Sequence, residues 1–127
     1  MKKLIQTENA PRAVGPYSQG IAIESGKLIF TAGQIAFHPE TNQMVDGGIE
    51  EQTERVIQNL EAILEAGGSG LDRVVKTTVF LKRMGDFQAM NQVYEKYFSD
   101  QPPARSTVEV SALPKGALIE MECIAVQ

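Results

Sequence analysis

The chain has 127 residues, of which 43% are hydrophobic and 22% are charged. This length and composition predict a single globular domain, residues 1–127, with one core. The formal net charge is −4, which disfavours a nucleic-acid partner because such surfaces usually carry a basic patch that displaces counterions. No apolar run is long enough to serve as a signal peptide or to cross a bilayer, so we expect a cytoplasmic protein with no membrane partner.

The chain contains one cysteine, Cys123, and one histidine, His38. A single cysteine cannot form an intrachain disulfide, which suits a reducing compartment. Zinc sites take several cysteine or histidine ligands, so these two residues predict no metal site. A nucleophilic triad would have to be built around His38, which lies in a predicted loop, and we do not expect one.

Two elements are predicted in the first half of the chain. The stretch from Gly20 to Ala36 is typical of a β-hairpin that turns at Ser25-Gly26, and a further short strand can precede it. From Ile49 to Ala66, apolar residues recur at helical spacing. Gly67-Gly68 then ends this predicted helix.

Strands and helices alternate in the second half of the chain. We expect a buried strand, a helix capped by Asp86, a strand that begins at Arg105, and a final strand. The first, second and fourth of these span Val74 to Leu81, Phe87 to Phe98, and Leu118 to Val126. This order predicts an α+β domain in which two helices pack on one face of a mixed sheet. The other face would need cover, which an oligomer supplies.

Arg105 is a charged residue at the start of a strand rich in β-branched residues. Side chains alternate along a strand, so Arg105 and Thr107 share one face. A guanidinium is a planar fork that matches a carboxylate, and a substrate carboxylate is one interpretation. The alternative, which the spacing alone favours, is a strand-end salt bridge with one of three acidic residues, Glu109, Glu120 or Glu122.

Glu120 lies on a strand face that is apolar at its ends and acidic in the middle. A face open to solvent explains this pattern. The alternative is a carboxylate in a crevice that orients or deprotonates a water. The strands of Arg105 and Glu120 are candidates for neighbours in the sheet, although the sequence leaves their register open.

Asn91 and Tyr17 are further candidates for a binding site. Asn91 is an amide on an otherwise aromatic helical stripe, and a buried amide needs a hydrogen-bond partner. Tyr17 lies in the glycine-flanked loop GPYSQG, beside a predicted strand, where ligand-binding groups are common. The alternatives are a stripe edge that faces water for Asn91 and plain ring packing for Tyr17.

These features occur together in one known family. The chain resembles the RidA/YjgF/YER057c/UK114 family along nearly its whole length. The resemblance is carried by Ala10-Pro11, GPYSQG, AGQI at residues 32–35, NQVY at residues 91–94, and above all PARSTVEVSALPKGALIEMECIAV at residues 103–126.

The resemblance implies a chorismate-mutase-like fold, in which a six-stranded mixed sheet is backed by two helices. It also implies a homotrimer with clefts between its subunits. The implied activity is that of a 2-iminobutanoate/2-iminopropanoate deaminase, which hydrolyses reactive enamines and imines to 2-oxo acids and ammonia. Neither a cofactor nor a metal is implied.

Roles for individual residues also follow from the resemblance. Arg105 would bind the substrate carboxylate, and Glu120 would hold the attacking water with backbone groups near Gly33. Tyr17, from the adjacent subunit, and Asn91 would line the cleft. The chain departs from the family at Thr107, where cysteine is common, but a hydroxyl can also bind a carboxylate or a water.

Other functions remain as alternatives. The same cleft would serve a non-catalytic, small-ligand-binding regulatory protein. An endoribonuclease that inhibits translation is a further alternative, which the acidic charge and the single histidine disfavour. Chorismate mutase would share only the fold, and a fold alone does not transfer a function.

Overall fold

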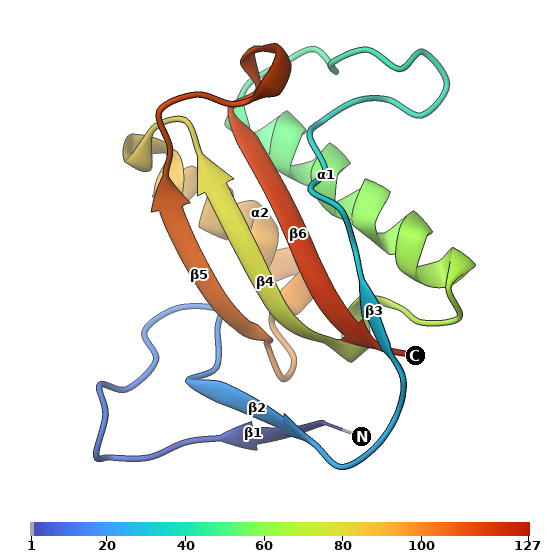
Figure 1. The fold of residues 1–127 in the computed structure, drawn as a ribbon. Helices are drawn as coiled ribbons and strands as arrows, with labels where there is room; N and C mark the ends of the chain where they lie inside the picture. The colour runs from blue at the N-terminus through green and yellow to red at the C-terminus, as the bar shows by residue number, and fades with distance from the viewer. Residues whose placement is uncertain (1) are drawn as a thin grey trace.

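A computed structural model describes residues 2–127 and shows a four-stranded sheet, a separate two-stranded sheet and two α-helices (Figure 1). The strands and helices in chain order are β1 (Lys2–Ile5), β2 (Gly20–Ile23), β3 (Leu28–Phe30), α1 (Ile49–Ala66), β4 (Val74–Leu81), α2 (Phe87–Phe98), β5 (Ala104–Glu109) and β6 (Ile119–Val126). Three short 3₁₀ turns span Leu71–Arg73, Met84–Asp86 and Pro114–Gly116. Among these described residues, no helix is both long and apolar enough to cross a membrane.

The four-stranded sheet has the order β3-β6-β4-β5. β4 and β5 run parallel, while β6 is antiparallel to both β3 and β4. Both helices pack on one face of this sheet (Figure 1). Val56 and Leu60 of α1 belong to the same buried core cluster as Val79 of β4 and Met121 of β6. The predicted α+β class, the mixed sheet and the two helices on one face are confirmed. The single six-stranded sheet is wrong, because β1 and β2 form a sheet of their own.

The hairpin predicted between Gly20 and Ala36 does not form. β2 pairs with β1, and β3 pairs with β6, where Ile29 lies opposite Ala125. Between β2 and β3, Gly26 has a φ of +128°, a conformation that favours glycine, and the chain leaves one sheet there for the other. The alternation of side chains predicted the strands, but not the partner that each strand takes.

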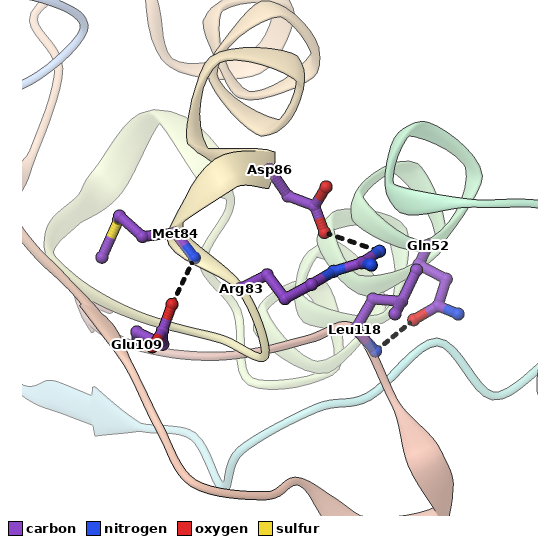
Figure 2. A network of polar contacts seen from close by, with 6 residues as sticks. All are labelled: Gln52, Arg83, Met84, Asp86, Glu109 and Leu118. Atoms are coloured by element: carbon purple, nitrogen blue, oxygen red, sulfur yellow. Dashed lines mark hydrogen bonds and ion pairs between the residues drawn. The ribbon is translucent and has the colours of Figure 1, made fainter.

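The two helices begin and end at the predicted residues. Asp86, however, does not cap α2 with its side chain. It belongs to a 3₁₀ turn, and its Oδ2 lies 3.7 Å from Nη2 of Arg83 in an ion pair (Figure 2). The 3₁₀ turn leads directly into α2, so the helix starts without a side-chain cap.

Two side chains fasten the connections at one end of the sheet (Figure 2). Oε1 of the buried Gln52 in α1 accepts a hydrogen bond of 2.9 Å from the backbone N–H of Leu118, the residue before β6. Oε1 of Glu109 accepts one of 2.7 Å from the N–H of Met84. These bonds tie the end of β5 and the start of β6 to neighbouring segments. They therefore help to place both strands that carry the candidate site residues.

Candidate functional site

Arg105 projects from β5 toward the helix-covered face of the sheet. It lies opposite Thr77 of β4 in the strand register, and its Nη1 donates a hydrogen bond of 2.7 Å to Oδ1 of Asn91 in α2. The structure thus brings together two of the residues predicted for the site. Burial lowers the pKa of the Arg105 guanidinium from its usual value, since removal from water disfavours the charged form.

Three aromatic rings surround the guanidinium. Its Cζ atom lies 4.7 Å from the ring centroid of Tyr94, 5.4 Å from that of Phe87 and 5.8 Å from that of Tyr17. Each distance is within the range of a cation–π interaction, which stabilises a charge without neutralising it. The predicted stripe of α2 supplies Phe87 and Tyr94, so the sequence contained the signal for these two rings. Only the structure connects them with Arg105.

Arg105 has no acidic partner among residues 2–127. The predicted alternative, a salt bridge with Glu109, Glu120 or Glu122, is therefore wrong for this chain. The guanidinium makes one hydrogen bond within the described residues, to Asn91, and an arginine carries five N–H donors. Donors and charge are left for an anionic ligand.

Tyr17 reaches Arg105 because the loop before β2 is fastened to the start of β5. The N–H of Ser18 donates to the carbonyl of Pro103 at 3.1 Å, and its hydroxyl donates to the carbonyl of Pro102 at 2.5 Å. The phenol oxygen of Tyr17 in turn accepts a bond of 3.3 Å from the N–H of Val14. Tyr17 therefore lies beside Arg105 of its own chain, whereas the family resemblance implied a Tyr17 from the adjacent subunit.

Thr107 lies on the same strand face as Arg105, two residues further along β5, opposite Val79. Its hydroxyl oxygen is buried and has no hydrogen-bond partner among residues 2–127. A buried hydroxyl without a partner costs free energy, so native proteins rarely keep one. This hydroxyl, on the same strand face as Arg105, is therefore a candidate to hold a ligand.

Glu120 lies on the opposite face of the sheet. It pairs with Phe80 of β4, whereas Thr107 and Met121 both pair with Val79, the neighbour of Phe80 that points the other way. The strands of Arg105 and Glu120 are also not neighbours, because β4 lies between β5 and β6. One chain therefore does not bring these two residues together.

Gly33 packs directly against the Glu120 carboxylate. A Cβ atom at position 33 would come within 2.9 Å of Cδ of Glu120, so a side chain there would displace the carboxylate. Two backbone bonds between Gln34 and Met121, of 2.8 and 3.1 Å, hold this segment along β6. Gly33 and Glu120 thus lie against each other, with Glu120 on the face opposite Arg105.

Comparisons with known proteins identify the family of the chain. A family model described as endoribonuclease L-PSP matches residues 7–127. The chain belongs to this family, the YjgF/RidA family. A RutC family protein of Pyrococcus abyssi is 57% identical over 124 residues, which cover 98% of this chain and 96% of that protein. This YjgF/RidA chain is also 42% identical to the 2-iminobutanoate/2-iminopropanoate deaminase of Mus musculus over 127 residues, or 100% and 93% of the two chains.

A solved structure of the same family supports the fold. The crystal structure of Escherichia coli TdcF with bound serine matches with a TM-score of 0.75 at 38% sequence identity, and the match covers 98% of each chain. In the YjgF/RidA chain described here, no three side chains of histidine, cysteine, aspartate or glutamate gather as a metal site within residues 2–127.

Proposed function

We propose that the protein is a 2-iminobutanoate/2-iminopropanoate deaminase that uses no cofactor and releases 2-oxo acids and ammonia. The observation that carries this proposal is the Arg105 guanidinium, which aromatic rings surround and which has no acidic partner within residues 2–127. A half-buried, unpaired cation of this kind favours a small carboxylate. The activity named for the mouse relative, and the amino acid bound by the related TdcF, support this choice.

The proposed site lies between two copies of the chain. Arg105 and Asn91 of one copy would face Glu120 and Gly33 of the next, since a single copy holds these pairs on opposite faces of the sheet. The face that carries Glu120 also exposes apolar side chains, with Phe30 at 68% and Val108 at 43% exposure. Burying such a face favours association. We propose that the assembly is a homotrimer with three equivalent sites.

Binding begins with the carboxylate in this proposal. Arg105 holds the carboxylate in two parallel hydrogen bonds, and the Asn91 amide holds the guanidinium from its other side. The hydroxyl of Thr107 hydrogen-bonds the ligand and gains the partner that it lacks. Fixing the ligand in this way makes the attack of a bound water effectively unimolecular.

The chemical step needs one acid/base group. The water oxygen forms a bond to the imine carbon, and Glu120 accepts the proton that the water loses. Glu120 returns this proton to the nitrogen and then passes the proton of the new hydroxyl group to the nitrogen as well, so that the carbon–nitrogen bond breaks and ammonia leaves as the carbonyl forms. One water and one imine are consumed for each 2-oxo acid and ammonia released. Because an imine carbon is already electrophilic, a modest rate enhancement is sufficient.

The direct test measures ammonia and 2-oxo acid release from imines that a threonine dehydratase generates in situ. Arg105→Ala should lower kcat/KM by about 10- to 100-fold, the usual effect of losing a charged hydrogen bond. Arg105→Lys keeps the charge without the fork and should recover only part of the loss. Arg83→Ala, which removes an exposed arginine, is the matched control and should be silent. Full acceleration by Arg105→Ala would disprove the proposal.

Two alternatives use other observations. A regulatory protein without catalysis would bind a 2-oxo acid through the same Arg105 guanidinium, and calorimetry would then find tight binding with no imine turnover. The description of the matching family favours RNA cleavage as an alternative. The net charge of −4 and the single histidine argue against it, and salt-dependent RNA binding by the purified protein would support it.

A further inference from the structure

Tyr94 makes two different polar interactions although it is fully buried, with 0% exposure. Its phenol oxygen lies 2.7 Å from Oγ1 of Thr77, which is also fully buried. The face of its ring lies under the Arg105 guanidinium, 4.7 Å from ring centroid to Cζ. On α2 the ring also packs against Phe98, with 4.5 Å between the ring centroids. The position of Tyr94 is therefore fixed at both its edge and its face.

Thr77 connects this tyrosine to the strand that carries Arg105. It lies directly opposite Arg105 in the parallel pairing of β4 and β5. The backbone next to Arg105 thus carries the hydroxyl that holds Tyr94, while the ring of Tyr94 supports the end of the Arg105 side chain. Arg105, Thr77 and Tyr94 therefore limit one another's positions through the strand pairing, the hydrogen bond and the ring contact.

We infer that Tyr94 is a positioning residue for Arg105, whose ring sets the plane and depth of the guanidinium, and that Thr77 holds this ring in place. The inference rests on the proposed role of Arg105 as the carboxylate-binding residue. Two parallel hydrogen bonds to a carboxylate require one orientation of the guanidinium plane, and a free arginine side chain has many. Asn91 restrains one nitrogen of the guanidinium, and the ring of Tyr94 restrains its plane.

A buried tyrosine that only fills the core is the competing explanation. In that case Thr77 merely satisfies a phenol, and the short distance to Arg105 has no consequence for binding. The pKa of Tyr94 is raised to about 12, chiefly by burial, so the phenol stays neutral at ordinary pH and the Thr77–Tyr94 pair persists there. The two explanations differ in what happens to carboxylate binding when the ring moves but the fold survives.

Four variants separate the ring from its hydroxyl. Tyr94→Leu removes the ring, and 2-oxobutanoate should bind about 3- to 25-fold more weakly, the range expected for a lost cation–π contact. Tyr94→Phe keeps the ring and should bind within about twofold of the original protein. Thr77→Val leaves the phenol without a partner, so the ring should shift and binding should weaken. Combining Thr77→Val with Tyr94→Phe removes both hydroxyls and should restore binding.

Calorimetry with 2-oxobutanoate and imine kinetics supply the first readouts, and KM should rise more than kcat falls. Leu64→Ala in α1 is the control for lost stability, since Leu64 is fully buried but lies in a different helix from Tyr94. It should lower the melting temperature without changing binding. Wild-type affinity in Tyr94→Leu, together with a comparable fall in melting temperature, would overturn the inference.

A readout on Arg105 itself separates this inference from the proposed function. The ¹⁵N signal of the Arg105 Nε–H group reports rotation of the guanidinium, which should become faster in Tyr94→Leu and stay slow in Tyr94→Phe. If Arg105→Ala binds 2-oxobutanoate normally, the carboxylate-binding role is lost but slow rotation would still support Tyr94 as the support of Arg105. Unchanged rotation in Tyr94→Leu would overturn the inference whatever the activity.

Discussion

Arg105 and Glu120 of one chain point to opposite faces of the four-stranded sheet, and β4 separates their strands. The sheet lies between these two side chains and keeps them apart. If both act on one substrate, each must meet its counterpart from a second copy. This arrangement leads to a prediction that does not depend on a structure of the assembly.

Two impaired variants should regain activity when they share an assembly. Alone, Arg105→Ala should lose about 10- to 100-fold in kcat/KM, and Glu120→Gln should also be strongly impaired. In mixed assemblies formed by co-expression or joint refolding, an intact site needs Arg105 from one variant and Glu120 from the other. For equal amounts of the two variants in closed rings, about a quarter of the sites should be intact. Imine turnover by the mixture measures this fraction.

The double variant provides the control for this experiment. Chains that carry Arg105→Ala and Glu120→Gln together, mixed with either single variant, can form no intact site, so the mixture should turn over no more imine than the single variant does alone. A mixture of the two single variants that shows no gain in turnover after verified subunit exchange would contradict a site between copies.

Replacing Gly33 by alanine should disturb Glu120. The added Cβ would meet the Glu120 carboxylate, whose Cδ it would approach to 2.9 Å. We expect kcat to fall by about 100-fold, because a shift of about 1 Å in a reacting group can have this effect. Gly85→Ala is the matched control, since a Cβ there meets nothing within 4 Å. Equal kinetics in the two variants would show that the position of Glu120 is unimportant.

Replacing Thr107 by valine should stabilise the free protein and weaken its activity. Valine keeps the shape of threonine and removes the buried hydroxyl that lacks a partner within residues 2–127. The melting temperature at fixed protein concentration should rise by a few degrees, as expected for relief of about 1 kcal/mol. KM should rise if this hydroxyl binds the ligand.

The opposite result is expected for Thr77, whose hydroxyl is bonded to Tyr94. Thr77→Val should lower the melting temperature, so the pair of variants compares a bonded with an unbonded hydroxyl. A fall in the melting temperature of both Thr77→Val and Thr107→Val would mean that the Thr107 hydroxyl has a hydrogen-bond partner in the assembled protein.

Stability should be lost at high pH through Tyr94. Its pKa in the folded chain is raised to about 12, chiefly by burial, so the unfolded chain loses this proton first. The contribution is complete below about pH 10 and is lost as the pH rises toward 12, by at most about 3 kcal/mol. Urea unfolding at pH 8 and pH 11 should therefore show that the free energy of unfolding falls less between these pH values in Tyr94→Phe than in the original protein. An equal fall in the free energy of unfolding in the original protein and in Tyr94→Phe would contradict this prediction.

The sequence predicted local structure better than it predicted partners. Ile49–Ala66 and Phe87–Phe98 are helices at the expected bounds, because helical periodicity and the glycines after the first helix act over a few residues. The hairpin from Gly20 to Ala36 failed because strand pairing joins distant segments, and β3 found its partner in β6. The pairing of β3 with β6 is therefore seen only in the folded structure.

The candidate site shows the same division. Arg105 and Asn91 were selected from motifs and do meet, but nothing in their spacing reveals the hydrogen bond between a strand and a helix. The rings of Tyr94 and Phe87 were visible as a stripe, while their closeness to Arg105 was not. Strand order, which places β4 between the strands of Arg105 and Glu120, likewise depends on contacts across the whole chain.

The opposite placement of Arg105 and Glu120 also has a consequence for how the protein responds to dilution. A site shared between copies exists only while the assembly holds, so turnover per chain should decline once the protein falls below its dissociation constant. The rate of imine hydrolysis would then fall more than proportionally when the concentration of the protein falls. Cells that produce little of the protein would have almost none of its activity.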